Sequence, residues 1–428
     1  MKCRICGNPQ LRPVLHLGEQ ALTGVFPSTR DERITTGPLE LVKCWRGDGS
    51  AVCGLLQLRY SYDGAEMYGT NYGYRSGLNS SMVAHLESRV EQLRSRISLN
   101  RGDLVVDIGS NDGTLLSFYP RDLQLVGIDP TGIKLKQYYP RHVDLLPTFF
   151  SARVLQSYTS RKARVVTSFS MFYDLEDPLG FVGEVRDILA DDGVWMIEQS
   201  YMPAMLRANA FDTVCHEHLE FYDLSQVQWM ADRAGLEVLD VDFNNVNGGS
   251  FSVLLAKPGA GYTRSSRVDE ALARERAEGL NTLAPYEAFA RRVKRFRDDL
   301  DELLHGFQHQ GRLVAGYGAS TKGNVLLQYC NITAHQVPCI GEINADKYGR
   351  FTPGTLIPIV SEAEAKALAP DYLLVLPWHF RDYFVEREAS YFRQGGRLLF
   401  PLPNIALVPP LSEVPAHHRA LRTLTPAT

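Results

Sequence analysis

The sequence lacks the features that mark membrane, exported and nucleic-acid-binding proteins. No apolar run approaches the roughly 20 residues that span a bilayer, and the first residues contain no apolar stretch typical of a secretion signal. The formal net charge of -4 gives no strong positive field for nucleic acid or an anionic membrane. We therefore expect a cytoplasmic protein, monomeric or a small homo-oligomer, that acts on a small molecule and binds neither nucleic acid nor membranes.

Cysteine is also scarce, and the 7 cysteines are odd in number and too scattered for a disulfide framework. A cluster nevertheless lies near the start of the chain, formed by Cys3, Cys6, Cys44 and Cys53. Because four thiolates make a closed tetrahedral site, we predict a structural zinc ion. The second pair is more widely spaced than usual, so residues 45–52 must loop out. The alternative is free cysteines and a chance Cys-x-x-Cys pair.

Internal repeats and low-complexity tracts are absent too, and the apolar pattern indicates an α/β protein. Residues 83–99 have helical apolar spacing. Strand-like apolar runs then alternate with helical stretches, at 103–108, 123–128, 163–168 and 193–198. This alternation predicts a doubly wound parallel sheet.

The later part of the chain predicts the end of this sheet and a second domain. Two strand-like runs, 236–242 and 251–256, flank a Gly-Gly turn and predict a closing antiparallel hairpin, which by analogy is typical of sheets that bind S-adenosylmethionine (SAM). Residues 266–309 predict long helices broken near Pro285, and strand-like runs after residue 312 predict a second, smaller α/β domain. The predicted parts are a zinc module at 1–82, a first α/β domain at 83–257, a helical linker with the second α/β domain at 258–409, and a tail at 410–428.

A glycine-rich turn, Asp107-Ile-Gly-Ser-Asn-Asp-Gly113, comes after the first strand, and we expect a helix to begin directly after it. Glycine lets the backbone approach a ligand closely, and Asp129 at the end of the next strand can bind ribose hydroxyls of an adenosine ligand. A structural turn with a surface aspartate, or an NAD site, would show the same two features. The candidate cofactor-binding residues are Asp107, Gly109, Asn111, Asp112, Gly113, Asp129, Ser168 and Phe169.

The stretch His216-Glu217-His218 is the best candidate for catalysis. A histidine can act as a general base near neutral pH, and the glutamate can orient it or share its proton. The spacing differs from the His-Glu-x-x-His helix of zinc proteases, which makes metal binding the poorer interpretation. A hydrogen-bonded pair of core histidines is the other alternative.

Two further segments are candidates for substrate binding. Residues 68–79 combine aromatic and polar side chains, although such a stretch alone is more typical of a packed loop. The turn at 316–324 opens a helix and could hold a diphosphate through its backbone N–H groups, or it could be purely structural. The candidate substrate-binding residues are Tyr68, Arg75, Asn79, Ser320, Thr321, Lys322, Asn324, Arg350, Trp378 and His379.

Taken together and in this order, the motifs resemble the nucleotide-sugar C-methyltransferases of deoxysugar biosynthesis over nearly the whole chain. The resemblance implies a central class I SAM-dependent methyltransferase domain with a Rossmann-like fold, an N-terminal zinc module, and a second Rossmann-like domain that binds the nucleotide diphosphate. It also implies that His218 is the base with Glu217 beside it, and that tyrosines including Tyr72 and Tyr74 close over the sugar. Asp174 stands where the family has a histidine.

We therefore expect SAM-dependent C-methylation of a nucleotide-linked 4-keto sugar. His218 would remove a proton next to the ketone, and Tyr72 or Tyr74 would hold the oxyanion while the enolate carbon takes the methyl group. One competing interpretation is an NAD-dependent nucleotide-sugar oxidoreductase, which the predicted hairpin and the lack of a Tyr-x-x-x-Lys pair near the first sheet disfavour. The other is a non-catalytic zinc-containing interaction protein, which His216–His218 disfavours.

Overall fold

The computed structural model describes residues 1–48, 51–67 and 74–409, and contacts divide the chain into two compact units, each with its own sheet. The first unit contains Met1–Leu15, Glu40–Ala204 and His216–Pro285. The second unit contains His16–Leu39, Met205–Cys215 and Tyr286–Thr428. Two segments from earlier in the chain therefore join the C-terminal unit, a grouping that boundaries at residues 82 and 257 do not anticipate.

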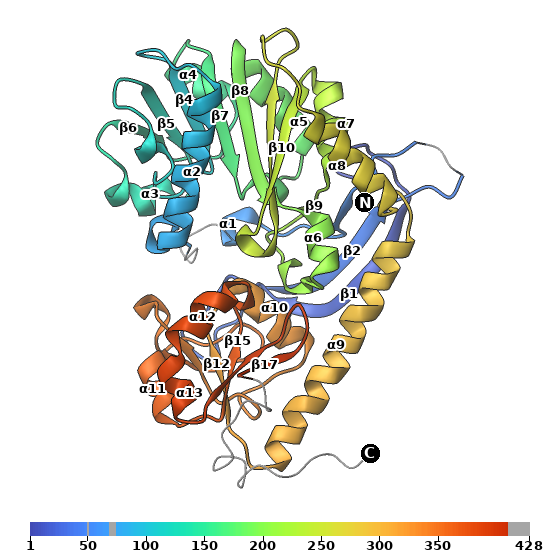
Figure 1. The fold of residues 1–428 in the computed structure, drawn as a ribbon, viewed down its shortest axis with the longest axis vertical. Helices are drawn as coiled ribbons and strands as arrows, with labels where there is room; N and C mark the ends of the chain where they lie inside the picture. Colours follow the sequence, from blue (N-terminus) through green and yellow to red (C-terminus); the bar gives the residue numbers. More distant parts are fainter. Residues whose placement is uncertain (49–50, 68–73, 410–428) are drawn as a thin grey trace. The chain divides into compact units, whose positions relative to one another are not determined.

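The first unit is built on a seven-stranded sheet with the order β10-β11-β8-β7-β4-β5-β6 (Figure 1). Strands β4 to β8 run parallel, and β11 runs antiparallel to both β8 and β10. This confirms the predicted parallel sheet and its closing hairpin. The strands are β4 (Leu104–Ile108), β5 (Gln124–Ile128), β6 (Val143–Leu146), β7 (Ala163–Phe169), β8 (Leu189–Ser200), β10 (Glu237–Asn244) and β11 (Ser250–Ala256).

Helices cover both faces of this sheet because both faces are apolar, as is usual for parallel strands. Val105 of β4 packs with Val90 of α2 on one side, whereas Val106 packs in the core with Val185 of α5 and Val227 of α7 on the other. The helices that lie wholly or partly in this unit are α1 (Gly64–Met67), α2 (Ser80–Arg96), α3 (Gly132–Leu135), α4 (Ala152–Tyr158), α5 (Pro178–Ile188), α6 (Met202–Arg207), α7 (Leu224–Ala234) and α8 (Ser266–Ala277).

The helix expected directly after the first glycine turn is replaced by a short 3-10 turn, Leu116–Phe118. Pro120 explains the difference, because proline lacks a backbone N–H and disfavours helical backbone in the residue before it. Tyr119 accordingly has extended backbone, with φ of -85° and ψ of 151°. The prediction of a helix at this point was wrong, so no α-helix N-terminus is available there to bind a ligand.

A smaller sheet with the order β1-β2-β3-β9 carries the N-terminal residues. Its strand β9 comes from the segment just after His218 and pairs antiparallel with β3. The strand β3 in turn pairs antiparallel with β2. The candidate catalytic segment is thereby joined to the zinc module. The strands are β1 (Leu11–Ala21), β2 (Thr36–Cys44), β3 (Leu56–Leu58) and β9 (Glu220–Phe221).

The second unit has a six-stranded sheet with the order β14-β13-β12-β15-β16-β17, parallel except for β17. It contains α9 (Ala284–His309), which begins at the predicted break, with Pro285 as its second residue. Its other elements are β12 (Val314–Tyr317), α10 (Thr321–Tyr329), β13 (Ile340–Glu342), β14 (Ile359–Ser361), α11 (Glu362–Ala367), β15 (Tyr372–Val375), α12 (Arg381–Arg387), α13 (Ala389–Arg393), β16 (Arg397–Phe400) and β17 (Ala406–Val408). Among the described residues, no helix combines the length and the apolar character needed to cross a bilayer.

Candidate active site

A pocket of about 210 Å³ lies at the carboxyl ends of β4, β5 and β7, the edge at which open α/β sheets bind their ligands. Gly109 and Asn111 come from the turn after β4, Asp129 from the end of β5, and Phe169 from the end of β7. The apolar part of the lining includes Met82, Leu86, Phe149, Phe150 and Phe181. A mostly apolar, aromatic pocket with two carboxylates, those of Asp129 and Asp174, suits an adenosine ligand, whose base is flat and whose ribose carries hydroxyls.

Two predicted residues shape the polar side of this pocket. Gly109 has a φ of 76°, and a Cβ added to it would lie 2.8 Å from Met171 Cγ, so only glycine fits there. Asp129 Oδ2 accepts the Asn111 backbone N–H at 2.8 Å, and Oδ1 accepts both the N–H and the hydroxyl of Thr131 at 2.7 and 2.6 Å. Burial raises the pKa of Asp129. The Asn111–Asp129 hydrogen bond therefore joins the glycine turn after β4 to the end of β5.

Other predicted cofactor residues do not line the pocket. Asp107 accepts the Thr167 hydroxyl at 2.6 Å, and burial raises the pKa of Asp107 to about 7. Ser168 Oγ accepts from the Trp195 indole at 3.1 Å, inside the sheet. Gly113 has a φ of 75°. None of these three, nor Asp112, is among the described residues that line the pocket.

The segment before α2 closes against the glycine turn. The Ser76 backbone N–H donates to Asn111 Oδ1 and the Gly77 N–H donates to Asp112 Oδ2, both at 2.9 Å. Tyr74 lines the pocket and is 48% exposed. The side chains of the predicted cofactor residues Asn111 and Asp112 therefore hold this segment in place.

The other site residues predicted within 68–79 are Arg75, Asn79, Tyr68 and Tyr72. The Arg75 guanidinium lies 4.0 Å from the centre of the Tyr138 ring. The Asn79 side chain accepts the Ser81 N–H at 3.0 Å and caps α2, which is a structural role. Tyr68 and Tyr72 lie outside the described residues.

The histidine segment runs beside the wall of the pocket. Leu219 donates its N–H to the Tyr173 carbonyl at 2.8 Å, and the His218 ring lies 4.3 Å from the Tyr173 ring. The next residue, Asp174, lines the pocket. His218 and Glu217 are half-buried. His218 thus contacts the residue that precedes pocket-lining Asp174, but His218 is not itself among the described residues that line the pocket.

His216 has a different environment from His218. It is fully buried, and its ring meets the Tyr62 ring edge-on at 4.6 Å. Residues 216 and 217 form a turn. The contact with Tyr62 fits a packing role, and the two histidines contact different rings.

Sequence reasoning missed two buried acids beside the predicted residues. Glu220 is buried, its Oε1 lies 3.5 Å from Arg4 Nε, and burial raises the pKa of this carboxyl well above its usual range. Asp212, in the second unit, is also buried. The available signal for Glu220 was its place two residues after His218, but nothing in the sequence indicates that Arg4 is its partner.

The four N-terminal cysteines converge as predicted. Their Sγ atoms all lie within 4.8 Å of one another, with Cys3 and Cys53 at 3.3 Å and Cys6 and Cys44 at 3.5 Å. The wide spacing of the second pair is accommodated because Cys44 ends β2 and Cys53 precedes β3, its antiparallel partner. Four converging thiolates, with no further metal-binding side chain grouped with them among the described residues, fit a closed structural zinc site.

The second unit brings several predicted substrate residues to the carboxyl ends of β12 and β15. Trp378 Nε1 donates to Asp212 Oδ2 at 2.7 Å. Burial raises the pKa of Asp212, and the charge of Lys322 opposes this shift. Burial and the same lysine lower the pKa of His379 to about 3, so His379 is neutral near pH 7. Asp212 is thus bonded to an indole and feels the charge of Lys322, and the same lysine acts on the neutral imidazole of His379.

The other predicted residues of this unit mostly serve the fold. Ser320 caps α10 by accepting the Gly323 N–H at 3.0 Å, and Thr321 is the first residue of that helix. Asn324 is fully buried and donates to the Thr23 carbonyl at 2.7 Å. Arg350 donates to two backbone carbonyls, each at 3.1 Å.

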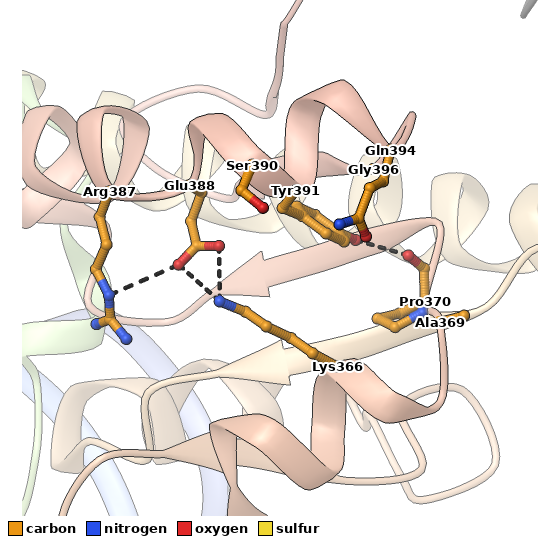
Figure 2. A pocket seen from close by; sticks show the side chains of 9 residues that line it. All are labelled: Lys366, Ala369, Pro370, Arg387, Glu388, Ser390, Tyr391, Gln394 and Gly396. Atoms are coloured by element: carbon orange, nitrogen blue, oxygen red, sulfur yellow. Dashed lines mark hydrogen bonds and ion pairs between the residues drawn. The ribbon is translucent and has the colours of Figure 1, made fainter.

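A second cavity, of about 410 Å³, lies beside the amino ends of β15 and β16 in the same unit (Figure 2). Lys366 Nζ contacts both oxygens of Glu388 at 2.8 and 2.7 Å, and Arg387 Nε lies 3.7 Å from Glu388. The Tyr391 hydroxyl donates to the Pro370 carbonyl at 2.7 Å. These polar groups already have partners within the protein, so we assign no ligand to this cavity.

Comparison with protein families agrees with this arrangement. A family described as "Methyltransferase domain" matches residues 82–241, and a zinc binding domain family matches residues 3–68. A third family, described as "C-methyltransferase C-terminal domain", matches residues 245–403. The first unit thus carries a class I methyltransferase fold, whose ligand is SAM, and the cysteine cluster is its zinc site.

Comparison with individual proteins found one relative that matches most of the chain and solved structures that match about two fifths of it. The chain is 32% identical to the C-methyltransferase NovU of Streptomyces niveus over 408 residues, which cover 94% of this chain and 96% of the relative. Among solved structures, a SAM-dependent methyltransferase of Clostridium acetobutylicum is 11% identical, with a TM-score of 0.34 and coverage of 41% of this chain and 92% of that chain. A methyltransferase structure from Bacillus halodurans is 14% identical, with a TM-score of 0.33 and coverage of 42% and 100%.

Proposed function

Because the chain belongs to the SAM-dependent C-methyltransferases, we propose that it methylates a carbon next to the ketone of a nucleotide-linked 4-keto sugar. The observation that carries this proposal is the ring contact of His218, a half-buried imidazole, with Tyr173, the residue that precedes pocket-lining Asp174. A carbon next to a ketone is acidic enough for an imidazole to deprotonate when the oxyanion is stabilised. Methylation of this carbon requires the C–H proton to leave first, because the carbon has no lone pair with which to attack, whereas an oxygen or nitrogen atom has one.

In this mechanism His218 takes the proton from the sugar carbon, and the electron pair of the broken C–H bond delocalises onto the ketone oxygen as an enolate. The hydroxyl of Tyr74, which lines the pocket, and that of Tyr72 are the proposed donors to the oxyanion. When bound, SAM supplies a sulfonium methyl group, which the enolate carbon takes as the ketone re-forms. Glu217 is proposed to orient His218 or share its proton.

The parts of the chain have distinct roles in this proposal. Residues 83–257 bind SAM, residues 1–82 hold zinc and contribute the tyrosines, and residues 258–409 bind the nucleotide diphosphate. Lys322 and the N–H groups at the start of α10 are the proposed diphosphate ligands, since both favour anions. Binding of the diphosphate, far from the reacting carbon, supplies energy that positions the sugar.

A first experiment tests the substrate class. The purified protein is incubated with SAM and dTDP-, GDP- or CDP-linked 4-keto sugars, and products are followed by mass spectrometry for a gain of one methyl group. Titration with S-adenosylhomocysteine (SAH) and with NAD separates the oxidoreductase alternative, because we expect tight binding of SAH alone. Absence of methyl transfer to every keto sugar would contradict the proposed substrate.

A second experiment tests the base. In deuterium oxide, the wild-type enzyme should exchange the proton next to the ketone, and His218→Asn should lose at least about 100-fold of this exchange, the usual contribution of a general base. His309→Asn, at an exposed histidine of α9, is the matched control and should exchange at the wild-type rate. Unchanged exchange in His218→Asn with intact SAH binding would remove His218 from this role.

A further inference from the structure

A group of charged side chains at the end of β8 has no part in the proposed chemistry. Glu198 is 4% exposed, and its carboxylate is surrounded by side chains of three other elements. Arg89 Nε of α2 lies 3.0 Å from Glu198 Oε2, and Asn244 Nδ2 donates to the same oxygen at 3.1 Å. His85 of α2 and Ser252 of β11 also contact the carboxylate at hydrogen-bond range. A buried carboxylate with this many partners is strongly held in one position.

The same residue is joined to the cofactor pocket through its backbone. Glu198 is paired with Phe169 of β7, and its carbonyl accepts the Ser170 N–H at 2.8 Å. Both Phe169 and Ser170 line the pocket. Ser170 has a φ of 53°, a backbone conformation that costs a non-glycine residue free energy and therefore depends on its surroundings. The hydrogen bond from Ser170 to Glu198 is one restraint that holds it there.

The helix α2 completes the connection. Met82 and Leu86 of α2 line the pocket, and His85 and Arg89 occupy the neighbouring stripe of the same helix turns. The ion pair between Arg89 and Glu198 therefore fixes how α2 is rotated about its axis and where it lies along that axis, at the turns whose apolar side chains line the pocket. Arg89 also pairs with Asp242 at 2.7 Å, which ties the same turn to β10.

We infer that Glu198 is a positioning residue for cofactor binding, which holds α2 through His85 and Arg89 so that Met82 and Leu86 form a wall of the SAM pocket. This inference rests on the proposed assignment of the pocket to the cofactor. Glu198 does not touch the ligand in this scheme; its side chain acts through α2, whereas its backbone bond to Ser170 would remain in any variant at this position. Its removal should therefore weaken SAM binding more than its effect on stability would explain.

The other end of α2 offers a matched control. Arg96 and Arg267 both contact Asp240 of β10, so this carboxylate also joins α2 to the sheet. Arg96 lies ten residues after Leu86, which is about 15 Å along a helix. Asp240→Asn should loosen the helix away from the pocket, whereas Glu198→Gln should loosen it at the pocket.

The experiment compares SAH dissociation constants by calorimetry at a temperature at which all variants are folded, with thermal midpoints measured in parallel. Glu198→Gln should weaken SAH binding by about ten-fold or more, the size expected when a charge-assisted contact is lost. Asp240→Asn should stay within about two-fold, since its ion pairs are half-exposed. His85→Gln, which removes one partner and leaves the Arg89 contact, should weaken SAH binding by a smaller factor and serves if Glu198→Gln does not fold. A variant that combines Glu198→Gln with His85→Gln should bind SAH no more weakly than Glu198→Gln alone, because both substitutions break the same link between α2 and Glu198.

Equal losses of affinity in Glu198→Gln and Asp240→Asn, or no loss in Glu198→Gln and His85→Gln, would overturn the positioning role while leaving the cofactor assignment intact. A wild-type protein that fails to bind SAH would overturn both.

Discussion

The two parallel sheets of the molecule repeat one backbone device. Gly109 follows β4 with a φ of 76°, and Gly318 follows β12 with a φ of 83°. A Cβ at Gly109 would lie 2.8 Å from the Met171 side chain, and one at Gly318 would lie 2.7 Å from Pro377. Met171 follows β7 and Pro377 follows β15, the strands next to β4 and β12 in their sheets. Glycine is therefore needed directly after β4 and directly after β12, where the chain passes close to the residues that follow the neighbouring strand.

The acidic residue at the end of the next strand is repeated as well. Asp129 accepts the Asn111 N–H at 2.8 Å in the first unit, and Glu342, the last residue of β13, accepts the Ala319 N–H at 2.7 Å in the second. Glu342 Oε1 also accepts the N–H of Asn344 at 2.9 Å, much as Asp129 accepts that of Thr131. In both sheets a carboxylate fixes the glycine turn.

What differs is the chemistry around the turn. The first unit surrounds Asp129 with Phe149, Phe150 and other apolar side chains, which suit an uncharged aromatic base. The second unit places Lys322 and His379 near its turn, with α10 starting directly after it. In the proposed function, therefore, the same backbone geometry serves two different ligands, and the side chains beyond the acidic residue determine which one binds.

The largest expected effect concerns the cysteine cluster of the first unit, which has no counterpart among the described residues of the second. Cys44→Ser removes one of four zinc ligands and should lose the metal, because a structural site tolerates few changes of ligand. Binding of zinc contributes on the order of 10 kcal/mol to the folding of such sites, so the first unit should unfold at a much lower temperature. Zinc content by mass spectrometry and calorimetric unfolding measure this.

Cys330→Ser, at a buried cysteine of the second unit, is the control and should keep its zinc. Full zinc content in Cys44→Ser would contradict the four-cysteine site.

The next effect tests whether the two glycine turns are equivalent. Gly109→Ala and Gly318→Ala should each lower the free energy of unfolding by about 2–4 kcal/mol, from left-handed backbone strain and from overpacking against the neighbouring strand end. Gly183→Ala in α5 is the control: its Cβ would meet nothing within 4 Å, and alanine favours helix, so stability should rise slightly. Denaturant titration gives all three values. A large loss of stability at one turn and none at the other would show that the two glycine turns are not equivalent.

A third prediction separates the ligands. Asp129→Asn should weaken SAH binding by about ten-fold, because a charged acceptor for ribose hydroxyls and for the turn is lost. Glu342→Gln should leave SAH binding unchanged and weaken binding of dTDP, the probe for the second unit. Calorimetric titration of both variants with both ligands measures the four values. A loss of SAH affinity in Glu342→Gln would show that the two acids do not serve separate ligands.

The sequence predicted the parts of this comparison that depend on local pattern. The apolar runs predicted both sheets, and the position of Asp129 after its strand identified one acid. It missed Glu342, whose strand β13 has only three residues and gives a weak signal. It also missed the buried acids Glu220 and Asp212, because their partners Arg4 and Trp378 are far away in the chain. Such pairings depend on tertiary structure, which local spacing does not determine.

The smallest expected effect concerns the position two residues before the turn glycine in each sheet. The first sheet has an acid there and the second does not. Asp107 occupies this place in β4, whereas Gly316 occupies it in β12. Burial raises the pKa of Asp107 from 3.8 to about 7, so between these values the folded protein holds a proton that the unfolded chain has lost. Because the folded state then binds more protons, the free energy of unfolding falls as pH rises, by about 1 kcal/mol between pH 6 and 7, and the loss is complete above pH 7.

Asp107→Asn should remove this contribution, while Asp122→Asn, at an exposed acid, should keep it. Thermal midpoints at pH 6, 7 and 8 measure the slope, and an unchanged slope in Asp107→Asn would mean that this carboxyl is already ionised throughout that range, held by Thr167 rather than by a proton.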